Sequence, residues 1–197
     1  MKPTESESFY NRFAFLYPAV DVLLRRQKQT LFDGINSLPE GHLLEIGVGN
    51  GGHLHLYKKH TVFGIDTSSA MLAIASRRNI NNAQLLQMNG ENLLFENAQF
   101  DYVVLSHVIA VVNNPEQLLA EVFRVLKSNG SLFILNHFTP DNWLKYVDYA
   151  FMPISKSFHF KSVFHINEIK TIRKFKLLKE VFFPPASYFK LLIYQKK

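Results

Sequence analysis

The chain has 197 residues, of which 47% are hydrophobic and 14% aromatic, and this composition predicts one compact domain rather than a disordered chain. It contains no cysteine, which excludes a disulfide framework, a thiolate nucleophile and a cysteine-ligated zinc site. The net charge of +6 is uneven: residues 1–150 carry 12 Lys and Arg against 14 Asp and Glu, and residues 151–197 carry 10 against 2. Such a basic segment either attracts the phosphates of lipids or nucleic acids or forms a solvated face.

The N-terminal segment, residues 1–8, is polar and partly acidic, and it lacks the basic start and apolar stretch of a signal peptide. No apolar run approaches the roughly 20 residues that a membrane-spanning helix needs. We therefore expect a cytoplasmic protein that at most touches the inner membrane face as a peripheral protein.

Apolar runs alternate with helical patterns along most of the chain. Helices are predicted over residues 9–16, 19–35, 52–59, 68–78 and 115–127, with Ser68 as an N-cap and Pro115 in a first turn. Strands are predicted over residues 43–46, 61–65, 84–88, 100–105 and 131–136, the last after an Asn129-Gly130 turn. Strand and helix alternating five times indicate a parallel sheet with helices on both faces.

The C-terminal part of the chain follows a different pattern. Residues 175–183 and 188–194 are two strand-like runs around Pro184-Pro185, which predicts a hairpin that adds an antiparallel edge to the sheet. Further helices are expected over residues 141–151 and 166–174. The predicted fold is α/β, a doubly wound, mostly parallel seven-stranded Rossmann-like sheet with a C-terminal antiparallel hairpin.

A glycine-rich loop, residues 45–52, stands between a predicted strand and a predicted helix, where open α/β sheets bind ligands. Gly47, Gly49 and Gly52 match the pattern G-x-G-x-x-G, and Asp66 follows Gly47 by 19 residues at the end of the next strand. This spacing places a carboxylate on ribose hydroxyls, as in a nicotinamide dinucleotide site, so a dinucleotide is one possible ligand.

Three features favour S-adenosylmethionine as the ligand of this loop. Glu45 lies two residues before the first glycine, where a carboxylate suits the ammonium of the methionine part and fits poorly beside a pyrophosphate. Asn89-Gly90-Glu91 follows the third strand, where a polar side chain can reach the adenine amino group. The C-terminal hairpin is typical of methyltransferases and unusual in dehydrogenases. The sequence therefore predicts S-adenosylmethionine as the cofactor.

From about Tyr10 to the C-terminus, the sequence resembles the class I S-adenosylmethionine-dependent methyltransferases. The segments that carry this resemblance are residues 45–51, 64–72, 100–104 and 124–130. A narrower resemblance, to bacterial phosphatidylethanolamine N-methyltransferases and the related quinone C-methyltransferases, rests on residues 44–49, 54–57, 108–112, 136–138 and 153–156 and on Tyr10 and Tyr17.

The resemblance implies a role in cofactor binding for a set of residues in this chain. Glu45, Gly47 and Gly49 are expected at the methionine end, Asp66 at the ribose, Met71, Asn89 and Gly90 at the adenine, Ser106 beside the sulfonium and Tyr10 in a lid. The whole chain is interpreted as a single methyltransferase domain. Residues 1–38 are expected to form the helical lid, 39–138 the cofactor-binding core, and 139–197 the acceptor-side helices and hairpin.

Methyl transfer from a sulfonium is an in-line displacement, so the protein mainly supplies orientation and electrostatics. An amine acceptor must first lose a proton. His137 and His107 follow the fifth and fourth strands and are the candidate proton acceptors, against the alternative that each is a structural histidine. Tyr17 would stabilise a methylated ammonium through its ring, or belongs to the apolar face of an N-terminal helix. His53 and His55 point apart on the predicted helix, so no metal site is expected.

The leading functional hypothesis is N-methylation of an aminophospholipid such as phosphatidylethanolamine. A methyltransferase for a quinone or another small molecule is the first alternative, and a non-catalytic cofactor-binding module is the second. A nucleic-acid acceptor is disfavoured because no Asn/Asp-Pro-Pro-Tyr-type motif is present. Contact with an anionic membrane is expected through the helix that begins near Phe9 and through residues 151–161, and the oligomeric state is left open.

Overall fold

The structure is a computed structural model that describes residues 25–139, 165–183 and 189–197. The predictions for residues 9–16, 141–151 and 151–161, and for Tyr10 and Tyr17, lie outside these ranges. The described strands are β1 (His42–Ile46), β2 (Thr61–Asp66), β3 (Ala83–Gln87), β4 (Phe100–Ser106), β5 (Leu126–His137), β6 (Phe175–Phe183) and β7 (Phe189–Lys196). The helices are α3 (Arg25–Asn36), α4 (Ser69–Ser76) and α5 (Pro115–Val125), with 3-10 turns η2 (Leu54–Leu56), η3 (Ile166–Glu168) and η4 (Lys170–Lys174).

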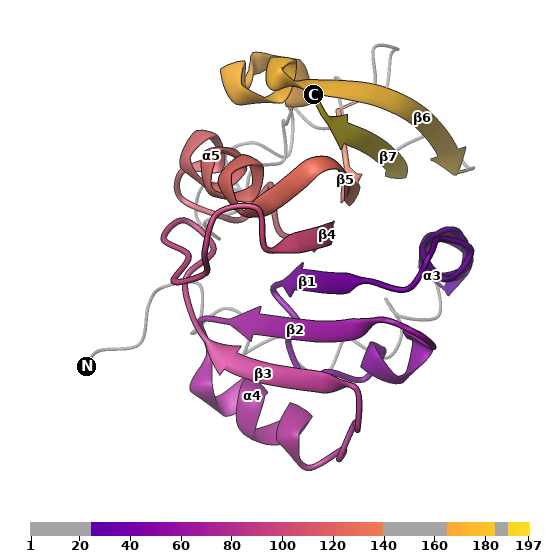
Figure 1. The fold of residues 1–197 in the computed structure, drawn as a ribbon, viewed down its shortest axis with the longest axis vertical. Helices are drawn as coiled ribbons and strands as arrows, with labels where there is room; N and C mark the ends of the chain where they lie inside the picture. The colour runs from indigo at the N-terminus through magenta and orange to yellow at the C-terminus, as the bar shows by residue number, and fades with distance from the viewer. Residues whose placement is uncertain (1–24, 140–164, 184–188) are drawn as a thin grey trace.

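The strands form one seven-stranded sheet in the order β3-β2-β1-β4-β5-β7-β6 (Figure 1). Strands β1 to β5 pair in parallel, and β7 pairs antiparallel with both β5 and β6. The predicted mostly parallel sheet with an antiparallel hairpin is therefore confirmed. The strand order reverses between β1 and β4, and ligands of open α/β sheets bind at the carboxyl ends of the strands beside such a switch point.

Two apolar cores cover the two faces of the sheet. On one face, α3 and α4 contribute Leu31 and Leu72 to a core that includes Val104 of β4. On the other face, α5 and η3 contribute Leu118 and Ile166 to a second core. The middle strands are buried on both sides, which explains their continuous apolar runs. Among the described residues, no helix is long and apolar enough to cross a bilayer.

Two predicted helix starts are confirmed, and one predicted helix is wrong. The Ser68 hydroxyl accepts a hydrogen bond from the Met71 amide, and Pro115 stands in the first turn of α5. The helix expected over residues 52–59 is only the single turn η2. The Asn36 side chain donates to the Leu56 carbonyl at 2.9 Å and accepts from the Lys58 amide at 3.1 Å, so these backbone groups are bonded to a side chain rather than to a continuing helix.

Two further expectations need correction. The Asn129-Gly130 turn lies within β5, where Asn129 adopts a left-handed φ of 63° near a shift in the β4–β5 register. The helix expected over residues 166–174 is instead the pair of turns η3 and η4, separated at Ile169, whose backbone is extended. Glu116 of α5 accepts from the backbone amides of Lys170 and Thr171, and this contact replaces the amide bonding of a longer helix.

Glu116 links α5 to the turn η4, which directly precedes the C-terminal strand β6. Its carboxylate accepts from the Lys170 amide at 2.8 Å, from the Thr171 amide at 2.9 Å and from the Thr171 hydroxyl. The hydrogen bond from the Thr171 hydroxyl, supported by the two amides, lowers the pKa of Glu116 below its ordinary value of 4.5. The ionised form is thus favoured in the folded state, and its contribution to stability is present above pH 4.5 and lost as the pH falls.

We predict that Glu116→Gln lowers the free energy of unfolding at neutral pH. The deficit relative to wild type should be smaller at about pH 3 than at neutral pH, because more of the wild-type carboxyl is then protonated and resembles the amide. Urea melts at both pH values measure this, with Glu168→Gln, an exposed neighbour, as the matched control. An equal deficit at both pH values would show that the charge of Glu116 is unimportant.

Candidate functional site

The glycine-rich loop leaves the carboxyl end of β1 and turns back onto β2. The amides of Gly47 and Val48 both donate to the Ile65 carbonyl, at 2.7 and 3.1 Å. Gly47, Gly49 and Gly51 have left-handed φ values of 80°, 54° and 65°, whereas Gly52, the third glycine of the G-x-G-x-x-G match, does not have a left-handed φ. A Cβ on Gly47 would lie 2.3 Å from Cγ2 of Val108, so only glycine lets the loop pass this close to the segment after β4.

Asp66, at the end of β2, holds the loop in place. Its Oδ2 accepts from the Gly49 amide at 2.8 Å, and its Oδ1 accepts from the Ser68 amide at 2.9 Å. Each carboxylate oxygen has a second lone pair, so Asp66 can still accept hydrogen bonds from a ligand hydroxyl. The structure thus brings together two of the predicted cofactor residues, and it gives Asp66 a structural role that the sequence did not predict.

Glu45 is the most deeply buried charged residue of the site, with 1% of its surface exposed. Its Oε1 lies 2.8 Å from Nε2 of His53, and its Oε2 has no hydrogen-bond partner among the described residues. A buried acceptor without a donor costs on the order of 1–3 kcal/mol. An ammonium group, which carries three donors and no acceptor, would supply the missing hydrogen bond.

Two neighbours of Glu45 were missed as site residues by the sequence analysis. His53 bonds the carboxylate, and its ring lies 5.9 Å from that of Phe32 in α3. The Tyr57 hydroxyl is buried and, like Oε2, forms no hydrogen bond of ordinary geometry within the described part of the chain, although it lies near the Glu45 carboxylate. Burial raises the pKa of Tyr57 well above 10, and the charge of Glu45 and the interaction of the phenol with its carboxylate raise it further, so the phenol stays protonated. The only signal in the sequence was their nearness to the glycine loop.

The residues expected at the adenine end lie after β2 and β3. Met71 is half-buried in the first turn of α4, and the Met88 amide after β3 donates to the Asp66 carbonyl at 3.0 Å. Asn89 is exposed, and its Oδ1 accepts from the Glu91 amide within its own turn. Gly90 is buried, and a Cβ there would lie 2.7 Å from Cγ2 of Ile46. The structure therefore assigns Gly90 a packing role against the core.

The residues expected on the acceptor side follow β4 and β5. Ser106 ends β4, and His107 after it has a left-handed φ of 60° and an amide that donates to the Leu135 carbonyl. The rings of His107 and His137 lie 5.7 and 6.2 Å from that of Phe189 in β7. The two candidate histidines thus converge on one aromatic ring at the carboxyl edge of the sheet. A left-handed non-glycine residue costs on the order of 1 kcal/mol, and such strain is often found at functional sites.

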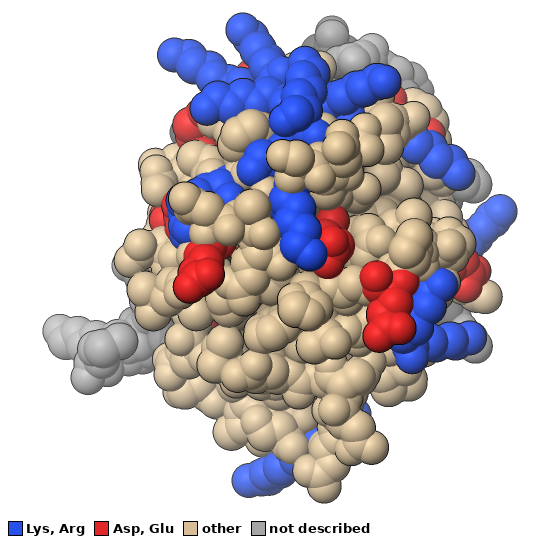
Figure 2. Space-filling model, in the orientation of Figure 1, with Lys and Arg blue, Asp and Glu red and all other residues tan. Residues whose placement is uncertain are grey.

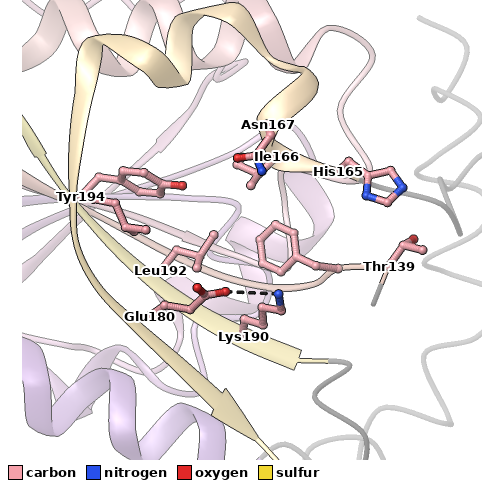
Figure 3. Close-up of a pocket in the computed structure, with 10 residues that line it drawn as sticks. Thr139, His165, Ile166, Asn167, Glu180, Lys190, Leu192 and Tyr194 are labelled. Atoms are coloured by element: carbon pink, nitrogen blue, oxygen red, sulfur yellow. Dashed lines mark ion pairs between the residues drawn. The ribbon is translucent and has the colours of Figure 1, made fainter. Parts of the chain in front are cut away.

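A separate cavity of about 150 Å³ lies between η3 and the antiparallel strands (Figure 3). Lys190 and Glu180 form an ion pair of 3.1 Å in it. Burial, followed by the charge of Glu180, raises the pKa of Tyr194 to about 12, so its hydroxyl stays protonated. Tyr194 belongs to the core on the α5 face, whereas Phe189 packs against the core on the opposite face. The cavity therefore opens on the face of the sheet opposite to Phe189, although Phe138 and Thr139, which follow His137 in the chain, line it.

In residues 25–139, 165–183 and 189–197, no three His, Asp or Glu side chains are grouped in a way that could hold a metal ion. The candidate site comprises the loop, Glu45, Asp66 and the histidine pair. A cofactor with an ammonium group and ribose hydroxyls would match the first three.

A family model described as a methyltransferase domain matches residues 44–134. The phosphatidylethanolamine N-methyltransferase of Cereibacter sphaeroides is 32% identical over 165 residues, which are 80% of this chain and 81% of that protein. The demethylmenaquinone methyltransferase of Renibacterium salmoninarum is 26% identical over 140 residues, which are 68% of this chain and 59% of that protein.

Among solved structures, a SAM-dependent methyltransferase of Thermotoga maritima, described as a possible histamine N-methyltransferase, superposes with a TM-score of 0.72 at 24% identity. The superposition covers 96% of this chain and 99% of the other. A putative methyltransferase of Bacillus halodurans gives the same TM-score at 16% identity, over 85% of this chain and 97% of that chain. These likenesses concern the fold.

The loop geometry predicts that two glycines of the motif differ in their tolerance of alanine. Gly47→Ala combines a left-handed φ with the contact to Val108 and should lower the free energy of unfolding by about 2–5 kcal/mol. Gly49→Ala has the φ penalty but open space around its Cβ, and should cost only about 1–2 kcal/mol.

Urea unfolding of both variants measures this difference. Gly34→Ala serves as the control, because this α3 residue has open space around its Cβ and an ordinary φ, and the change should stabilise by about 0.5–1 kcal/mol. Equal losses at Gly47 and Gly49 would contradict the close approach of the loop to Val108.

Proposed function

The chain belongs to the S-adenosylmethionine-dependent methyltransferases, and from this premise we propose that it N-methylates an aminophospholipid such as phosphatidylethanolamine. The observation that carries the acceptor is the match to the Cereibacter sphaeroides enzyme, which extends over four fifths of both chains. A match of this extent includes the region after β5 as well as the cofactor loop. In this proposal, residues 1–38 form the lid, 39–138 the cofactor-binding core and 139–197 the acceptor side, and the enzyme works at the cytoplasmic membrane face.

We assign Glu45 to the ammonium of the cofactor, because its Oε2 is a buried acceptor that makes no hydrogen bond in the described part of the chain. The backbone of Gly47 and Gly49 lies beside the methionine end, and Asp66 accepts hydrogen bonds from the ribose hydroxyls. When bound, S-adenosylmethionine supplies an activated methyl group. The remaining assignments are Met71, Asn89 and Gly90 at the adenine, Ser106 near the sulfonium, and Tyr10 over the cofactor.

The acceptor amine is protonated at neutral pH and must give up a proton before its lone pair can attack. His137 or His107 accepts that proton in this proposal, since both lie at the carboxyl ends of β5 and β4, on the same edge of the sheet as the glycine loop. Their shared contact with Phe189 supports the assignment, because it fixes the two rings at one place. The role of Tyr17, an aromatic face for the methylated ammonium, stays a prediction.

The first alternative is a quinone or other small-molecule acceptor, which the match to a demethylmenaquinone methyltransferase supports over a smaller share of that protein. A carbon acceptor of that kind carries no ammonium proton, so the histidine would not have to accept a proton from an ammonium group before methyl transfer. The second alternative is a module that binds the cofactor without catalysis.

Incubation with methyl-labelled S-adenosylmethionine and a panel of acceptors tests the proposal. We expect label in phosphatidylethanolamine and none in demethylmenaquinone or RNA. His137→Ala should lower turnover of the lipid by at least about tenfold and leave affinity for S-adenosylhomocysteine unchanged, because general-base groups typically contribute a factor of about 10² to 10⁴.

Label in the quinone alone would replace the lipid by the first alternative. Cofactor binding without label in any acceptor would favour the non-catalytic module. Equal loss of turnover and cofactor affinity in His137→Ala would assign that histidine a structural role.

A further inference from the structure

The last 3-10 turn and the edge strand of the sheet carry a group of exposed basic side chains. We define the basic edge as Arg173 and Lys174 of η4 with Lys176 and Lys179 of β6, all four exposed. Figure 2 shows lysine and arginine side chains gathered at the end of the molecule where Figure 1 places β6 and β7. Because β6 is the last strand in the sheet order, this edge stands at the periphery of the described fold.

The positive charge of the basic edge is not neutralised locally. Within the described ranges, none of its four side chains forms an ion pair with a carboxylate. The nearby Glu180 pairs with Lys190 at 3.1 Å, and Glu116 is bonded to the Lys170 and Thr171 amides. Glu180 and Glu116 are therefore engaged elsewhere, and the exposed Glu168 of η3 forms no ion pair with the basic edge, which keeps its attraction for anions.

Large apolar side chains are exposed on the same strand. Leu177, Leu178 and Phe182 expose 47%, 48% and 51% of their surfaces. Lysines on an edge strand often serve only to block pairing with another chain. That explanation does not account for three exposed apolar side chains on the strand, which would increase the risk of association.

The β6–β7 register places Lys176 and Lys179 on one face of the strand and Leu177 and Phe182 on the other, where the Phe182 ring lies 4.9 Å from Nζ of Lys190. The free edge of the sheet is thus flanked by basic and by apolar side chains, and such an edge fits the boundary between lipid head groups and acyl chains.

We propose that the basic edge, together with Leu178 and Phe182, docks the protein on an anionic phospholipid bilayer. The proposal rests on the proposed function, since an enzyme with a phospholipid acceptor has to reach the bilayer surface. It adds a contact surface to the two segments that the sequence predicted. Three of the four charges are lysines, which suit a diffuse anionic surface, whereas recognition of individual phosphates favours the planar fork of arginine.

The position of β6 connects this surface to the acceptor side. Phe183 pairs with Phe189 across the β6–β7 ladder, and Phe189 pairs with His137 across the β7–β5 ladder. Neighbouring strands are separated by about 4.8 Å, so the end of β6 lies about 10 Å from the backbone of His137. Insertion of Phe182 into the head-group region would therefore bring the histidine pair close to the bilayer.

Vesicle co-sedimentation tests the docking surface. The full chain should bind vesicles of phosphatidylcholine with phosphatidylglycerol and bind pure phosphatidylcholine weakly. The triple variant Arg173→Gln, Lys176→Gln, Lys179→Gln should partition about 100-fold less well, since each basic residue near the surface contributes about a factor of five. The control Lys58→Gln, Lys59→Gln, Arg77→Gln removes the same charge from exposed residues far from β6 and should bind as wild type.

A second readout separates this proposal from the acceptor assignment. With a short-chain, monomeric phosphatidylethanolamine, the triple variant should turn over as fast as wild type, whereas turnover on anionic vesicles should fall. Leu178→Ser should weaken vesicle binding several-fold without affecting the monomeric assay.

Three outcomes would overturn the docking surface. The triple variant and the control could lose the same amount of vesicle binding, or the wild type could fail to bind anionic vesicles at low salt. The third outcome is that the wild type binds RNA and the triple variant does not. Failure of wild type to methylate the monomeric lipid would instead overturn the proposed function, and the vesicle result would stand on its own.

Discussion

The candidate cofactor site depends on a buried carboxylate, Glu45, of which only one oxygen has a hydrogen-bond partner in the described part of the chain. Glu45 is the next-to-last residue of β1, beside the switch point of the sheet, and one of its carboxylate oxygens lies within hydrogen-bond distance of the His53 ring. The glycine loop has to close tightly to bring His53 back, which is why its glycines adopt left-handed φ values and Gly47 passes against Val108. The second oxygen makes no hydrogen bond within the described residues, although the Tyr57 phenol lies near the carboxylate, and a ligand with an ammonium group would supply a charged donor there.

The antiparallel strand β7 organises the other half of the site. A purely parallel sheet would leave His137 and the edge of β5 without a covering side chain from the sheet itself. Since β7 runs antiparallel to β5, Phe189 comes to lie opposite His137 and within ring contact of His107. The same strand joins the acceptor side to β6, so one structural element connects the chemistry to the surface that we propose meets the membrane.

Local patterns in the sequence predicted the strands, the Ser68 cap and the position of Asp66, because periodicity and capping depend on neighbours in the chain. They failed where distant side chains decide the structure. The helix expected over residues 52–59 is shortened by Asn36, which bonds the backbone at Leu56 and Lys58 from another element. The bond of His53 to Glu45 arises in the same way, since it depends on how the loop folds back and no spacing rule predicts it.

The central claim is that the second oxygen of Glu45 receives the ammonium of S-adenosylmethionine. Calorimetric titration of the wild type with S-adenosylhomocysteine and with its deaminated analogue tests this most directly. A hydrogen bond to a charged group contributes about 1.5–3 kcal/mol, so the analogue should bind about 10- to 100-fold more weakly, and Glu45→Gln should narrow that difference. Equal affinity for the two ligands, or tighter binding of a nicotinamide dinucleotide than of S-adenosylhomocysteine, would contradict the account.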